Sequence, residues 1–295
     1  MDAMNMPPTA RKVFDELFSW ASRHDRDGVH VYALVDMAGI GDDRAAAKAL
    51  RTVKGAQAIS VLGNRGSDAE RAVPWLLRAN HHADDRWLRA TAQWAAHDPC
   101  LTWVASPLQP DDLAARLRAR AEALLPDDYA VLLRYFDPRV LPVLQHVLTE
   151  EQADAWWALG HSWAYLDRAM SLQCMALTLP SADDTLAVPL RLDQAQVDTM
   201  LSASEIDRVM PELVREVPDA FLERPTAERI AFTRRCLALA DQWNVHPFAH
   251  RVMVGVLALK LGENFHQEHQ WRPWIERLQQ GGMSLVDVIK HATAR

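Results

Sequence analysis

The chain has 295 residues, of which 49% are hydrophobic and 24% charged, an ordinary globular composition. Its formal net charge of −7 argues against a nucleic-acid binder, which needs a basic face. No apolar run approaches the roughly 20 residues of a membrane-spanning helix. The first residues lack the pattern of a secretory signal. We therefore expect a cytoplasmic protein with no membrane insertion and no nucleic acid as partner.

The three cysteines are far apart in the sequence and lie among apolar neighbours. They are Cys100, Cys174 and Cys236. An odd number of widely spaced cysteines does not suggest a disulfide framework, so we expect all three to be reduced core residues.

The first part of the chain alternates strand-like and helix-like segments. Residues 31–35 and 101–105 are continuous apolar runs, typical of strands that are covered on both faces. Apolar residues recur at helical spacing over residues 10–22, over residues 84–96 and after Pro110, and residues 42–54 have high helix propensity. This alternation predicts an α/β lobe with a mainly parallel sheet flanked by helices.

The stretch Tyr129–Arg139, YAVLLRYFDPR, is the most informative local signal. Its apolar run has no polar alternation, which predicts a buried central parallel strand. Asp137 can then cap the following turn, and Pro138 suits the first position of a helix. Pro142 disfavours an unbroken helix over residues 140–148. Either the helix begins near Pro142, or its first turn is distorted.

A capping box opens the next helix, with Thr149 as the cap and Gln152 three residues later. We expect this helix to continue to Leu166. Residues 170–179 predict a half-buried or edge strand. The composition changes at residues 180–189, PSADDTLAVP, which is the best candidate for a linker.

Beyond this linker the sequence is helical in pattern. Apolar residues recur at helical spacing over residues 192–201, 204–217, 226–243, 247–261 and 284–294. The chain therefore divides into an α/β lobe, residues 1–180, and an all-helical C-terminal lobe, residues 181–295.

Two aspartates stand at the ends of predicted strands, where catalytic groups gather in open parallel sheets. Asp36 is followed by MAGIG and Asp137 by PRVL, so neither has the second acid that a magnesium site typically uses. A hydrolase or phosphotransferase that uses Asp36 and Asp137 remains an alternative. In the other interpretation the two carboxylates pair with Arg134 or Arg139 and fix the loops. Carboxylates locked to arginines in the structure would favour this second interpretation.

Other pairs of reactive side chains lack the context that their chemistry requires. The HQEHQ segment is not a metalloprotease pattern, and the glycines of GNRGS are not followed by a helix start, so we interpret them as a polar segment and a turn. We therefore predict no catalytic residue, no metal site and no cofactor. The pairs considered are His266 with His269, His81-His82 with Asp84-Asp85, His97 with Cys100, and His161 with Ser162.

Eleven tryptophans are a large number for a chain of this length. Most should be core residues, because large aromatic rings bury the most area. Neighbouring tryptophans on one helix cannot all face the same core, and a surplus aromatic surface is typical of a protein-binding groove. The candidates for such a partner-binding surface are Trp156, Trp157 and Trp163.

The order of the motifs VYALVD, PWLL, LLRYFDPRVL and LTEEQ, followed by a tryptophan-rich helix, resembles the family catalogued as domain of unknown function 4123. The resemblance spans roughly residues 30 to 175, and RYFDPRVL is its most specific part. It implies a bacterial adaptor, or effector chaperone, of type VI secretion. Such a protein binds one cognate effector toxin and delivers it to the spike protein (VgrG), without catalysis or a cofactor.

The same resemblance places seven residues at the motif positions of the family, where they either support the structure or contact a partner. They are Asp36, Pro74, Trp75, Arg134, Asp137, Pro138 and Arg139.

Overall fold

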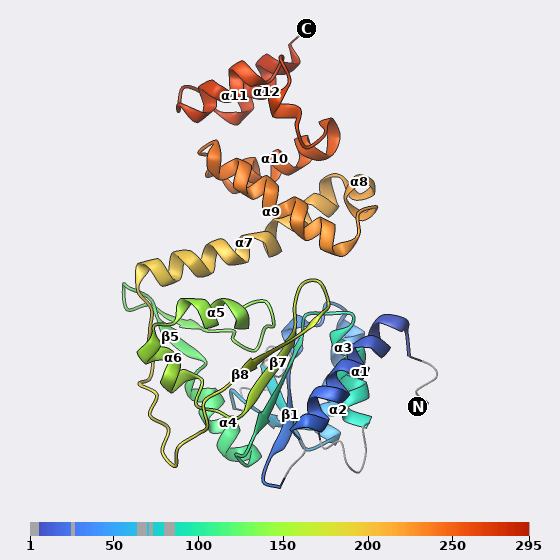
Figure 1. The fold of residues 1–295 in the computed structure, drawn as a ribbon, viewed down its shortest axis with the longest axis vertical. Helices are drawn as coiled ribbons and strands as arrows, with labels where there is room; N and C mark the ends of the chain where they lie inside the picture. The colour runs from blue at the N-terminus through green and yellow to red at the C-terminus, as the bar shows by residue number, and fades with distance from the viewer. Residues whose placement is uncertain (1–5, 25–26, 64–69, 71–72, 80–85, 295) are drawn as a thin grey trace. The chain divides into compact units, whose positions relative to one another are not determined.

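The computed structural model describes residues 6–24, 27–63, 70, 73–79 and 86–294 (Figure 1). The chain forms two compact units, Met1–Met200 and Leu201–Arg295. The first is a mixed α/β unit and the second is helical. The boundary therefore lies twenty residues beyond the predicted one at residue 180.

The α/β unit is built on a six-stranded sheet with strand order β2-β3-β1-β4-β7-β8. All neighbouring strands in it are antiparallel, so the prediction of a mainly parallel sheet is wrong. Strands that are buried on both faces show no alternation, and their sequences do not reveal the direction of their neighbours. The strands are β1 (His30–Asp36), β2 (Ile59–Ser60), β3 (Pro74–Arg78), β4 (Leu101–Ser106), β7 (Ser162–Leu166) and β8 (Leu172–Ala176).

Helices cover both faces of this sheet (Figure 1). Val31, Ala33 and Val35 of β1 face one core, and Tyr32 and Leu34 face the other. This explains why the strand reads as a continuous apolar run. The first core receives α1 (Pro8–Arg23), α2 (Asp43–Gly55) and α3 (Arg86–Ala95), and the second receives α4 (Pro110–Ala119), α5 (Leu141–Val147) and α6 (Glu150–Trp156).

The stretch after Tyr129 is not a central strand. It forms β6 (Ala130–Leu132), which pairs antiparallel with β5 (Glu122–Leu124). On its other side β5 pairs in parallel with β9 (Leu190–Arg191). The prediction of a buried strand is therefore wrong, because only one face of this small sheet packs on the core and Leu132 is 50% exposed.

The predicted capping box is confirmed at Thr149 and Gln152. The helix that it opens ends at Trp156 rather than at Leu166, and the chain continues into β7. Gly160 lies in the turn between them, where an added Cβ would come within 2.3 Å of the Ala105 carbonyl oxygen. This close approach lets the chain enter the sheet directly beside β4. The prediction of an edge strand is confirmed by β8.

The helix near Pro142 begins at Leu141, so the first of the two alternatives is confirmed. The proline lies in the first turn, where its missing N–H costs no hydrogen bond. Of the cysteines, Cys100 and Cys236 are buried as predicted, but Cys174 is exposed.

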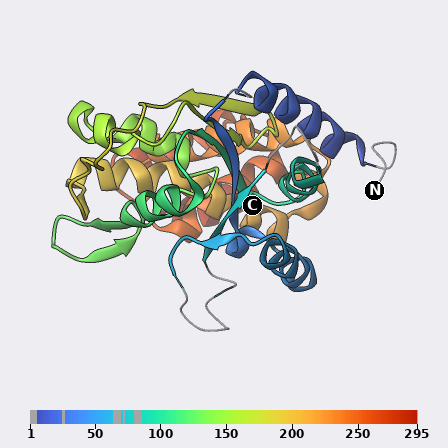
Figure 2. The same ribbon diagram turned by 90° about the horizontal axis from the view of Figure 1, so that it is seen from below.

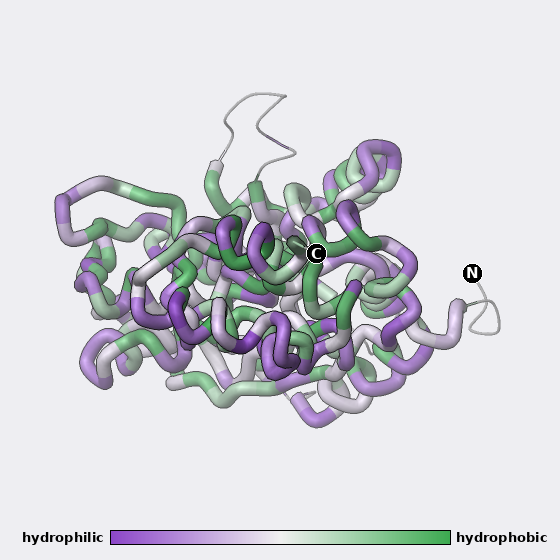
Figure 3. Tube along the Cα trace, turned by 90° about the horizontal axis from the view of Figure 1, so that it is seen from above, coloured by the Kyte–Doolittle hydropathy of each residue, from purple (hydrophilic) through white to green (hydrophobic). Residues whose placement is uncertain are grey.

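The second unit has the helical architecture that its sequence predicts. The predicted helices over residues 192–201 and 204–217 are one continuous helix, α7, and neither α8 nor α11 was predicted. Hydrophilic and hydrophobic stretches interleave along the chain trace (Figure 3), and the apolar residues of the second unit form one core. The elements are α7 (Gln194–Glu216), whose residues up to Met200 belong to the first unit, α8 (Pro218–Leu222), α9 (Thr226–Gln242), α10 (Phe248–Leu261), α11 (Arg272–Gln279) and α12 (Leu285–Thr293), with a 3-10 turn, η4 (Phe265–Gln267).

Candidate functional site

Asp36 is the last residue of β1 and is fully buried. Its Oδ1 accepts a hydrogen bond from the Ala38 N–H at 3.1 Å, which caps the 3-10 turn η2 (Met37–Gly39). Its Oδ2 accepts from Arg134 Nη2 at 2.5 Å. The carboxylate therefore ends the strand, shapes the next turn and neutralises a guanidinium group from a distant segment.

Asp137 lies in the turn that leads into α5 and is 4% exposed. Its carboxylate accepts two hydrogen bonds from the Arg139 guanidinium, at 3.0 Å from Nε to Oδ1 and 2.7 Å from Nη2 to Oδ2. Oδ1 also accepts from the Arg139 N–H at 2.9 Å. This bidentate arrangement fixes the turn, as a cap at Asp137 was expected to do.

Asp36, Asp137 and their arginine partners form one electrostatic group, which we call the carboxylate cluster: Asp36, Arg134, Asp137 and Arg139. Burial raises the pKa of Asp36, and the charge of Asp137 adds to this, whereas Arg134 acts in the opposite direction. Burial also raises the pKa of the nearby Cys100 thiol, and the charges of Asp98, Asp36 and Asp137 add to the effect. Cys100 is therefore a protonated core residue and not an activated nucleophile.

The remaining motif residues lie close to this cluster or in the core. Pro74 is directly opposite Asp36 in the pairing of β1 with β3, and Trp75 is opposite Val35. Trp75 is 7% exposed, and its Nε1–H donates to the Glu70 carbonyl oxygen at 3.1 Å. Pro138 is buried. The geometry of these residues supports the fold and leaves no free acid in the cluster.

The three tryptophans proposed as a partner-binding surface are core residues instead. Trp156 and Trp163 have no exposed area, and Trp157 is 7% exposed. The rings of Trp156 and Trp163 are stacked, with centroids 6.2 Å apart, and Trp157 meets Trp156 edge-on at 4.4 Å. Because α6 ends at Trp156, the turn carries the next ring into the same core. These residues offer a partner no surface in this structure.

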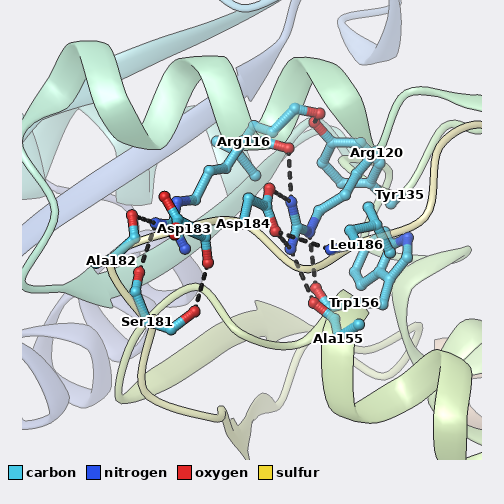
Figure 4. A network of polar contacts seen from close by, with 11 residues as sticks. Arg116, Arg120, Tyr135, Ala155, Trp156, Ser181, Ala182, Asp183, Asp184 and Leu186 are labelled. Atoms are coloured by element: carbon cyan, nitrogen blue, oxygen red, sulfur yellow. Dashed lines mark hydrogen bonds and ion pairs between the residues drawn. The ribbon is translucent and has the colours of Figure 1, made fainter.

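Sequence reasoning missed a buried arginine, Arg120, which joins three distant segments (Figure 4). Its Nη1 and Nη2 donate to Asp184 Oδ2 and Oδ1 at 2.7 and 3.0 Å. Nε and Nη2 also donate to the carbonyl oxygens of Trp156 and Ala155, and Nη1 to that of Arg116, all at 2.8–2.9 Å. The segment expected to be a linker is thereby fastened to the α/β unit.

The sequence does contain a signal for this residue. Leu113, Leu117 and Ala121 mark the buried face of α4 and its end, and Arg120 lies three residues after Leu117 on that same face. A cation at an apolar position needs a partner within the fold, because a buried unpaired charge is very costly. The partner is not readable from the sequence, since Asp184 is 64 residues away.

We predict that the Arg120–Asp184 ion pair makes the free energy of unfolding depend on pH in the acid range. Burial opposes ionisation of Asp184, but the hydrogen bonds and charge of Arg120 outweigh it and lower the pKa below its ordinary value of 3.8. The ion pair therefore contributes fully to the free energy of unfolding above pH 3.8. This contribution is lost as the pH falls through the lower pKa of Asp184 in the folded state. Urea unfolding should show Asp184→Asn less stable than the wild type near neutral pH, with the difference closing in stronger acid. A difference that does not change with pH would contradict this.

The other candidate pairs gain no support. In the part of the chain that the structure describes, no three His, Cys, Asp or Glu residues are grouped to hold a metal ion. Ser162 is buried in β7 and accepts a hydrogen bond from Trp20 Nε1 at 3.1 Å. His81-His82, Asp84-Asp85 and most of GNRGS lie outside the described residues. Among the described helices, none has the length and apolar character to cross a membrane.

Comparison with known proteins gives one finding. Residues 31–155 match the model of a family described as Domain of unknown function (DUF4123). Neither the curated proteins nor the solved structures contain a match. The matched range covers β1 to α6 and thus the whole carboxylate cluster. The match confirms the resemblance seen in the sequence over residues 31–155, which lie within the α/β unit.

Proposed function

We propose that this protein is a non-enzymatic adaptor, or effector chaperone, that binds one cognate toxin and loads it onto the spike protein (VgrG) of a type VI secretion system in the bacterial cytoplasm. The observation that carries the proposal is the DUF4123 match over residues 31–155, together with the role that the family resemblance implies. The pairing of both motif aspartates with arginines supports a structural role for the motif.

The alternative is a hydrolase or phosphotransferase that uses Asp36 and Asp137. A general base or metal ligand needs a carboxylate that is free to accept a proton or an ion. Here each carboxylate already accepts from a guanidinium group and from a backbone N–H. The geometry therefore favours the adaptor over the enzyme.

The helical unit offers a surface for the toxin. It contains a cavity of about 350 Å³ between α9, α10 and η4, with Cys236, Leu239 and Ala258 among its lining residues. A cavity of this kind can receive an apolar side chain from a helix of the partner. Ala238, which is exposed at this cavity, gives a way to block it. In our proposal the cavity is the anchor point for the toxin.

The proposal is tested by deleting the gene and measuring secretion of each effector. Only the cognate toxin should be lost, and the wild-type chain should restore it. Ala238→Arg should fail to restore secretion and should lose the toxin in co-purification. Ala227→Arg, at an exposed position of the same helix away from the cavity, is the matched control. Normal secretion of all effectors without the chain would overturn the adaptor proposal, and normal rescue by Ala238→Arg would overturn the cavity alone.

A further inference from the structure

The edge of the small sheet is open at β6. The strand order is β6-β5-β9, so β6 is the outermost strand of this sheet in the described part of the chain. The hairpin of β5 and β6 lies at the periphery of its unit (Figure 2). An open edge presents unpaired N–H and C=O groups and is a template for another strand.

The pairing of β6 with β5 shows which backbone groups point outward. Val131 lies opposite Ala123. On either side of this pair, the Leu133 N–H donates to the Ala121 carbonyl at 2.8 Å, and the Leu125 N–H donates to that of Tyr129 at 3.0 Å. In an antiparallel pair the inward and outward directions alternate. The N–H and C=O groups of Ala130 and Leu132 therefore point away from β5, toward solvent.

The side chains at this edge are apolar and accessible. Tyr129 is 67% exposed, Leu132 is 50% exposed, and Ala130 is exposed as well. Because side chains alternate along a strand, Val131 and Leu133 lie on the face opposite to Ala130 and Leu132. Both pack on the core, which holds the strand in its register. The edge thus combines a fixed backbone with apolar side chains that a further strand would cover.

The charges at the two ends of the strand identify the occupant. Asp128 stands at the turn and Arg134 at the far end, with side chains 72% and 40% exposed. Asp128 uses Oδ1 for Arg191, and Arg134 uses Nη2 for Asp36, so each has a further polar atom to offer. An antiparallel partner must place a base beside Asp128 and an acid beside Arg134. The segment DYAVLLR meets this requirement when it pairs with itself.

We propose that β6 pairs antiparallel with β6 of a second copy of this chain, with Val131 on the two-fold axis. Ala130 then lies opposite the partner's Leu132, and Asp128 lies opposite the partner's Arg134. A shift of the register by two residues removes both ion pairs, and a shift by one turns the outward backbone groups away from each other. The contact is small, so the dimer is weak and depends on concentration.

Disulfide trapping tests the pairing and its register in the full chain. The exposed Cys174 is first replaced by serine, and Cys100 and Cys236 are buried. Three variants then carry one new cysteine each: Ala130→Cys, Val131→Cys or Leu132→Cys. At the two-fold axis the Cα atoms of a non-hydrogen-bonded pair lie about 4.5 Å apart, within the range of a disulfide. Residues on the diagonal lie about 7–8 Å apart and are too distant.

We expect Val131→Cys to give a disulfide-linked dimer under mild oxidation, and the other two variants to give several-fold less. Sedimentation of the unmodified chain should show the average mass rising with concentration from 33.3 kDa toward twice that value. Asp128→Lys should abolish the rise, because it places two cations opposite each other. Equal trapping at all three positions, strongest trapping at Ala130 or Leu132, or a constant monomer mass would overturn the proposal. A monomer that still carries its toxin would leave the adaptor function intact.

Discussion

Replacing Arg120 by alanine should lower the free energy of unfolding of the α/β unit by about 3–5 kcal/mol. The side chain has no exposed area and forms five hydrogen bonds, two of them with Asp184. Its removal leaves the Asp184 carboxylate without its cation and the carbonyl groups of Ala155, Trp156 and Arg116 without this donor. Urea unfolding followed by circular dichroism measures the loss.

Arg191→Ala is the matched control, because it removes the same side chain from an exposed ion pair. Arg191 and Asp128 are 71% and 72% exposed, so this substitution should cost less than about 1 kcal/mol. Proteolysis gives a second measurement. Arg120→Ala should be cleaved faster between residues 181 and 189, because Arg120 holds this segment through Asp184. If the two substitutions lower the free energy of unfolding equally, Arg120 does not hold the segment in place as its contacts indicate.

In the carboxylate cluster, removing the partly exposed Arg134 should lower the free energy of unfolding more than removing the buried Asp36. Arg134→Ala leaves Asp36, which has no exposed area, as a buried charge without its cation, at a cost of about 3 kcal/mol. Asp36→Ala leaves an arginine that is 40% exposed and can turn into water. It also removes the cap on the Ala38 N–H, so we expect about 1–2 kcal/mol. Chemical unfolding of both variants decides the order.

The pH dependence of Arg134→Ala separates charge from packing. Burial raises the pKa of Asp36 above its ordinary value of 3.8, and loss of Arg134 raises it further. The folded state then holds the proton more tightly than the unfolded state. The loss in free energy of unfolding of Arg134→Ala relative to the wild type should be small below pH 3.8. It should grow as the pH rises through the raised folded-state pKa of Asp36. A deficit that is equally large in acid would mean that Arg134 acts through packing. Asp36→Ala, which lacks the titrating group, should not show this growth.

Local signals predicted the boundaries of several elements well. The Thr149 capping box and the start of α5 beside Pro142 depend on neighbouring residues only, and both are present. The direction of the strands could not be predicted, because helices cover both faces of the large sheet and erase the alternation. For the same reason the apolar run of β7 was taken for a continuation of α6.

The candidate site was predicted in part. The ion pairs of Asp36 and Asp137 with arginines were one of two interpretations, and the structure contains them. The tryptophans were misplaced because the end of α6 at Trp156 redirects the chain, which helical spacing cannot reveal. Asp184 was missed because a linker composition gives no sign that one of its acids meets a buried arginine.

The contacts of Arg120 with Asp184 also set an order for the folding of the α/β unit during its synthesis on the ribosome. Residues 110–156, which surround Arg120, leave the ribosome before the acid that neutralises it. A chain is synthesised from its N-terminus at about 5–20 residues per second, so Asp184 follows Arg120 by some seconds. Until then the Arg120 guanidinium group has no carboxylate to accept its hydrogen bonds. The second core of the sheet can therefore close completely only after residue 184 has emerged, and β9, which follows at Leu190, is among the last parts of the unit to join.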